Sequence, residues 1–274
     1  MSLKKLLTKL GKELLCIFLS VLVILPFYMV LINSFKTKSE SARMSLSFPT
    51  EWVFTNYTDV IAQGNLIRGF LNSLAYAAIS TTTGVLLCAM ASYVICRRAT
   101  KLNRFLYYFT ICGLFFPINY VTLVKVLQTF NLLDSRAGII ITFTSAMIPF
   151  CVFTIRNFVL SVPVEMDEAA FIDGASPNRV FFSIILPLLK PILVTCFILQ
   201  FMGVWSDFLT PLYLSSKGKL FPMTMSVYQF FGKNSSYWNY IFANIVLTCI
   251  PVIIVYMIGQ KYIVAGLTSG AVKE

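Results

Sequence analysis

Six long stretches of the chain carry almost no charge. Residues 14–32, 69–96, 105–124, 137–155 and 234–260 contain no Asp, Glu, Lys or Arg, and residues 180–206 contain only Lys190. Each stretch is long enough to cross a hydrocarbon core of about 30 Å as a helix. Lipid offers the backbone no hydrogen-bond partners, so a spanning segment must satisfy its own. The pattern predicts an all-α polytopic membrane protein with six transmembrane helices.

Composition supports this class and excludes others. Apolar residues make up 58% of the chain and charged residues 12%, with a mean hydropathy of +0.80. Soluble domains average about 45–50% apolar residues and about 25% charged residues. The composition therefore excludes a soluble enzyme, a disordered chain and a disulfide scaffold. The net charge of +11 does not indicate nucleic-acid binding, because the basic residues are scattered between apolar stretches.

Two basic clusters predict the orientation in the membrane. Six spans place both clusters on one side: Lys4, Lys5, Lys9 and Lys12 at the N-terminus, and Arg97, Arg98, Lys101 and Arg104 after the second span. The positive-inside rule assigns that side to the cytoplasm, so both termini are expected there. The predicted organisation is a cytoplasmic N-terminus (1–13), a first span (14–32), an external loop (33–69), a five-span core (70–262) and a cytoplasmic tail (263–274).

The residue types exclude most catalytic chemistry. The chain has no histidine, and its seven cysteines form no CxxC pair, so we expect no catalytic triad and no metal site. No phosphate-binding G-x-x-x-x-G-K-[ST] loop occurs. Asp207 is the only acid near a span, which disfavours ion-coupled transport. The energy for any transport must therefore come from elsewhere.

The connection between the fourth and fifth spans, 161–187, is the most distinctive segment. It contains four of the eleven acids: Glu165, Asp167, Glu168 and Asp173. Pro163 suits a first helical position, and acids favour the positive end of a helix. Gly174 suits a helix stop, and Ser176-Pro177 suits the start of a second helix. We expect an exposed acidic helix of about 10 residues.

That helix has two possible roles. Ala169 and Ala170 leave part of it without bulky side chains, so another protein could approach closely. The alternative is an ordinary solvated loop between spans. Physical reasoning from the residues alone leaves both open.

The same segment resembles a known family. Glu168-Ala169-Ala170, Asp173-Gly174-Ala175, Ile184-x-Leu186-Pro187 and Pro191 match the EAA signature of permease subunits of binding-protein-dependent ABC importers. Further motifs are similar to the carbohydrate branch, in particular to the second permease of maltose- and glycerol-3-phosphate-type systems. These are Asn33-Ser34-Phe35-Lys36, Asn56-Tyr57, Asn72-Ser73-Leu74, Trp205-x-Asp207-Phe208, and a tail motif running from Gly266-Leu267 to Gly270-Ala271-Val272-Lys273.

The resemblance implies a division of labour in a bacterial plasma membrane. Two homologous permeases form the pathway in the lipid bilayer. An ATPase dimer binds ATP and Mg on the cytoplasmic side. An extracellular or periplasmic binding protein delivers a sugar from outside. This chain would bind no cofactor. Its docking residues would be Glu165, Glu168, Ala169, Ala170, Asp173 and Gly174.

Two alternatives remain at this stage: a facilitator that uses the acidic helix only for assembly, and a membrane-embedded enzyme. A polar residue within a span can line a substrate path or bond between helices. The candidates for lining a sugar path are Asn72, Asn119, Thr122, Gln200 and Asn244.

Overall fold

The computed structural model describes residues 3–232 and 236–269, and within these ranges all regular secondary structure is helical, with no strand. The described chain divides into two compact units, one formed by 1–67 with 226–250 and the other by 68–225 with 251–274. The first unit holds α1 (Leu3–Asn33), α2 (Lys38–Ser41), α3 (Thr55–Gln63) and the first part of α14 (Trp238–Ser269). Gly270 to Lys273 of the predicted tail motif lie outside the described residues.

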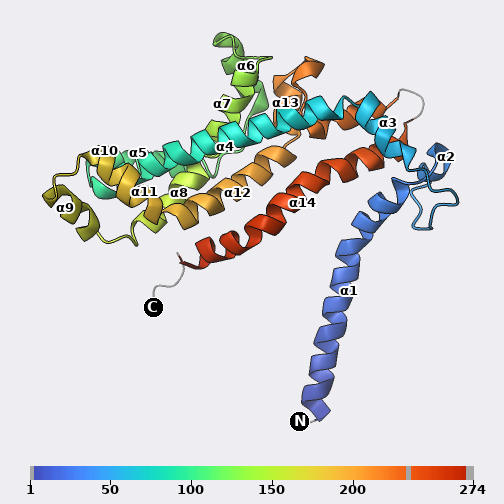
Figure 1. The fold of residues 1–274 in the computed structure, drawn as a ribbon, viewed down its shortest axis with the longest axis horizontal. Helices are drawn as coiled ribbons and strands as arrows, with labels where there is room; N and C mark the ends of the chain where they lie inside the picture. Colours follow the sequence, from blue (N-terminus) through green and yellow to red (C-terminus); the bar gives the residue numbers. More distant parts are fainter. Residues whose placement is uncertain (1–2, 233–235, 270–274) are drawn as a thin grey trace. The chain divides into compact units, whose positions relative to one another are not determined.

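The second unit holds most of the predicted core (Figure 1). Its helices are nearly all of α4 (Leu66–Arg97), α5 (Lys101–Cys112), α6 (Tyr120–Thr129), α7 (Arg136–Ala146), α8 (Ile148–Val159), α9 (Glu165–Ile172), α10 (Pro177–Arg179), a π-helical turn at Val180–Ile185, α11 (Leu186–Leu188), α12 (Lys190–Ser206) and α13 (Leu209–Leu214). Two 3-10 segments, Gly218–Leu220 and Met223–Phe230, precede α14.

Fewer uninterrupted spans are present than the sequence predicts. Three described helices are long and apolar enough to cross a membrane: Gly11–Asn33 of α1, all of α4, and Trp238–Tyr262 of α14. Two bent pairs, α7 with α8 and Pro177–Leu188 with α12, raise the number to five if each is one span. The stretches 137–155 and 180–206 are therefore not straight spans, with bends of 43° and 73° respectively. Pro149 and Pro191 lie at the second positions of the helices that follow the two bends.

The predicted third span, 105–124, is not one helix. α5 ends at Cys112 and α6 begins at Tyr120. Gly113 follows the last turn of α5, Pro117 has no backbone N–H, and the Asn119 side chain caps α6 by accepting from the N–H of Thr122 at 3.1 Å. These three residues stop a helix that uncharged composition alone would continue.

In the first unit, the Asn33-Ser34-Phe35-Lys36 motif at the end of α1 forms hydrogen bonds with distant segments. Asn56 donates from Nδ2 to the carbonyls of Ser34 and Lys36, both at 2.9 Å, and Asn239 donates to its Oδ1 at 2.8 Å. Lys36 is fully buried, and its ammonium donates to the carbonyl and the hydroxyl of Ser45. Burial lowers the pKa of Lys36, and nearby Glu40 partly offsets that effect. The motif thus fixes the segment that follows α1 against α3 and the start of α14.

Candidate functional site

The predicted acidic helix is present as α9, and its ends follow the expected chemistry. Glu165, Asp167 and Glu168 all lie in its first turn, where the helix dipole favours negative charge. At the other end Gly174 has φ +79°, and Gly174 and Ala175 donate N–H groups to the carbonyls of Phe171 and Ala170, each at 3.0 Å. This pair of bonds is a Schellman motif. The helix has eight residues rather than about ten, because Val164 is its N-cap residue; Pro163 therefore lies before the helix, and its predicted place at the first helical position is wrong.

The segment beyond Gly174 also starts as predicted. The Ser176 side chain accepts from the N–H of Arg179, and Pro177 occupies the first helical position of α10. α9 packs against the π-helical turn that follows α10. The acidic helix is therefore connected through a short rigid turn to the bent pair that ends in α12.

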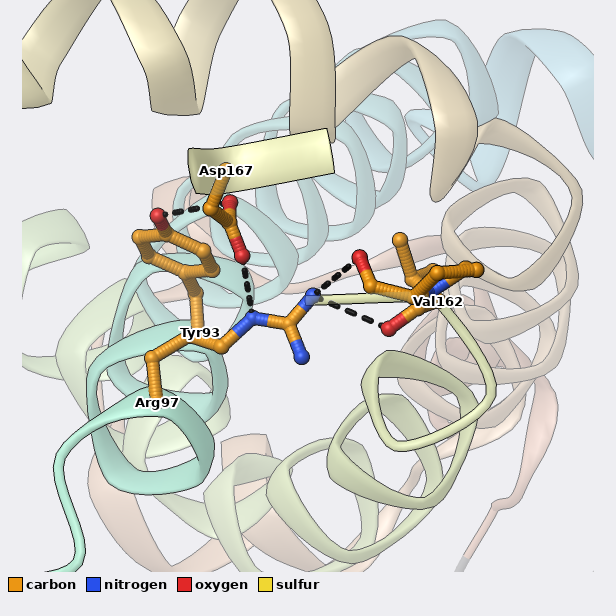
Figure 2. A network of polar contacts seen from close by, with 5 residues as sticks. Tyr93, Arg97, Val162 and Asp167 are labelled. Atoms are coloured by element: carbon orange, nitrogen blue, oxygen red, sulfur yellow. Dashed lines mark hydrogen bonds and ion pairs between the residues drawn. The ribbon is translucent and has the colours of Figure 1, made fainter. Parts of the chain in front are cut away.

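One buried ion pair anchors α9 to the end of α4 (Figure 2). The Arg97 Nε atom lies 2.5 Å from the Asp167 Oδ2 atom, and the two side chains are 13% and 6% exposed. The Tyr93 hydroxyl donates to Asp167 Oδ1 at 3.0 Å. Arg97 also donates from Nη2 to the carbonyls of Val162 and Pro163 at 3.0 and 3.3 Å. The guanidinium thus holds both the first turn of α9 and the chain leading into it.

Anchoring gives α9 two distinct faces. Asp167 and Ala170 point inward and are buried. Glu165, Glu168 and Ala169 are exposed, and so is Ile172, at 85%. Positions i, i+3, i+4 and i+7 share one side of a helix, so these four residues form a single outward strip, which we call the α9 face.

The predicted docking residues differ in their exposure. Ala170 is only 6% exposed, so its small side chain permits close packing within the chain rather than access for a partner. Asp173 and Gly174 are exposed at the end of the helix. The anchor formed by Tyr93, Arg97 and Asp167 was not predicted from the sequence, because Arg97 is equally well explained as part of the basic cluster that marks the cytoplasmic side.

A cavity of about 370 Å³ lies beside α9. Its wall includes Phe171 from α9, Met90 and Arg97 from α4, Asn178 from α10, and Phe182 from the π-helical turn, and Arg98, which directly follows α4, completes it. The cavity therefore combines apolar side chains with two guanidinium groups, those of Arg97 and Arg98.

Two of the residues predicted to line a sugar path are buried. Asn72 is buried in α4, donating to the carbonyls of Lys219 and Phe221 and accepting from Arg136. Asn244 is buried in the first unit and donates to Ser226. Both amides therefore serve hydrogen bonds within the chain.

The other three candidates are more accessible. Asn119 and Thr122 are exposed neighbours at the start of α6. Gln200 is half-buried in α12. Asp207, noted above as the acid nearest a span, accepts from the N–H and hydroxyl of Thr210, in the first turn of α13, at 2.8 and 3.0 Å. Pathway lining by the five candidates stays a prediction.

Comparison with known proteins identifies the family. Residues 6–269 match the family described as binding-protein-dependent transport system inner membrane component. The chain is 34% identical over 255 residues to the diacetylchitobiose uptake system permease protein NgcG of Streptomyces coelicolor, covering 92% of this chain and 84% of that protein. It is 31% identical over 252 residues to the melibiose/raffinose/stachyose import permease protein MelC of Bacillus subtilis, covering 91% of each.

The fold agrees with the sequence match. A chain from the crystal structure of a bacterial ABC transporter involved in the import of the acidic polysaccharide alginate superposes with a TM-score of 0.85 at 20% identity, covering 96% of this chain and 98% of that chain. The helical architecture and the sequence match over nearly the whole length lead to one conclusion: the chain belongs to the family of inner membrane components of binding-protein-dependent transport systems.

Proposed function

We propose that the chain is a transmembrane permease subunit of an ATP-driven importer that passes a di- or oligosaccharide into the cytoplasm. Family membership supports the transport role. The names of relatives support the substrate class, since NgcG is described for diacetylchitobiose and MelC for melibiose, raffinose and stachyose. The chain works with a second permease, an external sugar-binding protein and separate ATPase subunits that hold ATP and Mg. Both of its termini face the cytoplasm.

The α9 face carries the coupling part of the proposal. It offers two carboxylates, Glu165 and Glu168, beside the small Ala169 and the strongly exposed Ile172. The Ile172 side chain is 85% exposed. If a partner buries this apolar surface, the burial stabilises the complex. The Arg97–Asp167 anchor holds the helix from its other face, so a push on the α9 face is transmitted to α4.

Reversing one charge on the α9 face tests this role. In Glu168→Lys the fold is expected to persist, since surface changes cost little. Loss of a partnered charge at a partly dried interface costs about 2–5 kcal/mol. At about 1.4 kcal/mol per decade, that is about a thirtyfold or greater loss of ATPase association. The measurement is co-purification of the ATPase with the variant, with membrane levels of the variant alongside.

Glu51→Lys is the matched control, because Glu51 is an exposed acid in the predicted external loop. It should retain the ATPase and sugar uptake. Wild-type ATPase recovery and uptake with Glu168→Lys would show that α9 is only a connecting loop. Sugar flux that persists without any ATPase would instead identify a facilitator.

A further inference from the structure

The break between α5 and α6 leaves backbone groups without partners. Residues 113–119 include Pro117, and the carbonyl oxygens of 113–118 accept no hydrogen bond from any described residue. The N–H groups of Phe116, Ile118 and Asn119 likewise have no acceptor in the described part of the chain. Asn119 uses its Oδ1 atom to cap α6, while its Nδ2 group donates to no described acceptor. A stretch without charge thus contains a run of unpaired polar backbone.

The break lies beside the middle of a bent span. α5 packs against α8, and a Cβ added at Gly113 would lie 2.8 Å from Cγ of Pro149. Pro149 belongs to the first turn of α8, next to the 43° bend between α7 and α8. That pair reaches from Arg136 to Val159, so residue 149 is near its centre. Residues 113–119 therefore belong near the membrane midplane.

Lipid is a poor environment for this segment. Each unsatisfied backbone group in hydrocarbon costs several kcal/mol, so irregular backbone at membrane depth occurs only against protein or in a water-filled cavity. Phe115 and Phe116 are 79% and 75% exposed, so the other described helices of the second unit do not cover the segment. The unpaired carbonyls need donors that water or a hydroxylated ligand supplies.

We propose that residues 113–119 line the aqueous path and form a sugar-binding subsite. Free backbone carbonyls accept hydrogen bonds from sugar hydroxyls, and the Asn119 Nδ2 group donates to them. The rings of Phe115 and Phe116 stack on the apolar face of a pyranose. Discontinuous transmembrane helices mark substrate sites in other transporters for the same physical reason. The inference rests on the proposed sugar transport and adds where this chain contacts the sugar.

Accessibility of single cysteines tests the subsite in the reconstituted transporter complex. The exposed native cysteines, Cys16, Cys112 and Cys249, are first replaced by alanine. Phe115→Cys is then compared with Phe109→Cys, a matched control on α5 that is 68% exposed and lies within a continuous helix. The probe is a membrane-impermeant charged methanethiosulfonate, applied with and without a sugar. The sugar is chosen from a panel of di- and trisaccharides as one that the wild-type complex takes up.

We expect Phe115→Cys to react about tenfold faster or more than Phe109→Cys, because the reagent attacks thiolate and thiolate forms in water. The transported sugar should slow only the Phe115→Cys reaction. Equal, slow reaction at both positions would overturn the proposal, since protein or lipid would then cover residues 113–119. Fast reaction that the sugar leaves unchanged would overturn the sugar contact.

The two proposals fail in different ways. Failure of the wild-type complex to take up any sugar of the panel would contradict the proposed substrate class and, with it, this subsite. If uptake and ATPase co-purification are intact while Phe115→Cys is unreactive, only the subsite is wrong.

Discussion

α9 and residues 113–119 are both short interruptions between longer helices, yet they solve opposite problems. In α9 the C-terminal carbonyls of Ala170 and Phe171 are paired, and an ion pair with Arg97 fixes its inner face. In 113–119 the backbone is unpaired and the aromatic side chains are exposed. The hydrogen bonds at the end of α9 and the ion pair on its inner face are all formed within this chain, so the helix is held in place without a partner. The second segment, 113–119, is incomplete until water, a ligand or another chain satisfies it.

This difference separates two kinds of function. A rigid, satisfied helix suits the transmission of force to a protein partner, because it loses little conformational freedom on docking. Unpaired backbone suits contact with a passing polar ligand, because its N–H and C=O groups have no hydrogen bond within the chain that the ligand would have to replace. The experiments below either break this comparison or sharpen it, in order of expected effect.

Removing the anchor should have the largest effect. Arg97→Ala leaves the Asp167 carboxylate buried without its cation, and breaking a buried pair costs about 3–5 kcal/mol. We expect faster proteolysis between α8 and α10 and loss of the ATPase, with residues 113–119 unaffected. The measurement is limited proteolysis of the purified complex with mapping of the cut sites.

The double variant Arg97→Met with Asp167→Leu is the control. It replaces the pair by apolar side chains, which is often neutral for stability, so protease resistance should return. An Arg97→Ala protein as resistant as the wild type would contradict the anchoring role.

Changing Gly174 should have an intermediate effect. A Cβ at Gly174 meets open space, but the φ of +79° disfavours any side chain by about 1–2 kcal/mol. Gly174→Ala should therefore lower ATPase recovery by misdirecting α9, while Gly218→Ala, which also adds a Cβ in open space, should not. Quantitative co-purification of the two variants measures the difference. Equal recovery would show that the turn geometry does not position the α9 face.

The smallest expected effect is on stability and concerns the hydrogen bonds between Asp134 and Ser216. The Asp134 carboxylate accepts from the N–H and hydroxyl of Ser216, and these bonds lower the pKa of Asp134 below its ordinary 3.8. A depressed carboxyl pKa contributes stability that is present above pH 3.8 and is lost as pH falls through the folded value. Solvent screening limits the contribution to below about 1 kcal/mol.

Thermal melting of the wild type and Asp134→Asn measures this contribution. The difference between the two midpoints should be small above pH 4 and should shrink as the pH falls further. A difference that grows with acidification would contradict the assigned direction.

The sequence was sufficient to predict the parts of the site that depend on local chemistry. The acids of the first turn, the stop at Gly174 and the cap at Ser176 each act within a few residues, and all three are confirmed. The orientation of α9 about its own axis was not predictable in this way. It depends on Tyr93 and Arg97, and Tyr93 is 74 positions from Asp167. The buried position of Ala170 follows from that distant contact.

The breaks in the spans show the same limit. Gly113 and Pro117 were available as signals, but an uncharged run of sufficient length predicts a span whether or not its helix is continuous. Helix continuity depends on whether other groups satisfy the freed backbone, which composition does not record. The motif amides Asn56 and Asn72 likewise serve contacts far along the chain, so their buried structural roles became apparent only in the fold.

Cross-linking from two adjacent alanines tests the central claim most directly. In the background without Cys16, Cys112 and Cys249, Ala169→Cys and Ala170→Cys differ in sequence by one position, but position 169 is exposed and position 170 is buried. With a short bifunctional thiol reagent in the assembled complex, the α9 face predicts a cross-link from Ala169→Cys to the ATPase and none from Ala170→Cys. Equal cross-linking from both positions, or none from Ala169→Cys in a complex that retains uptake, would contradict docking through this face.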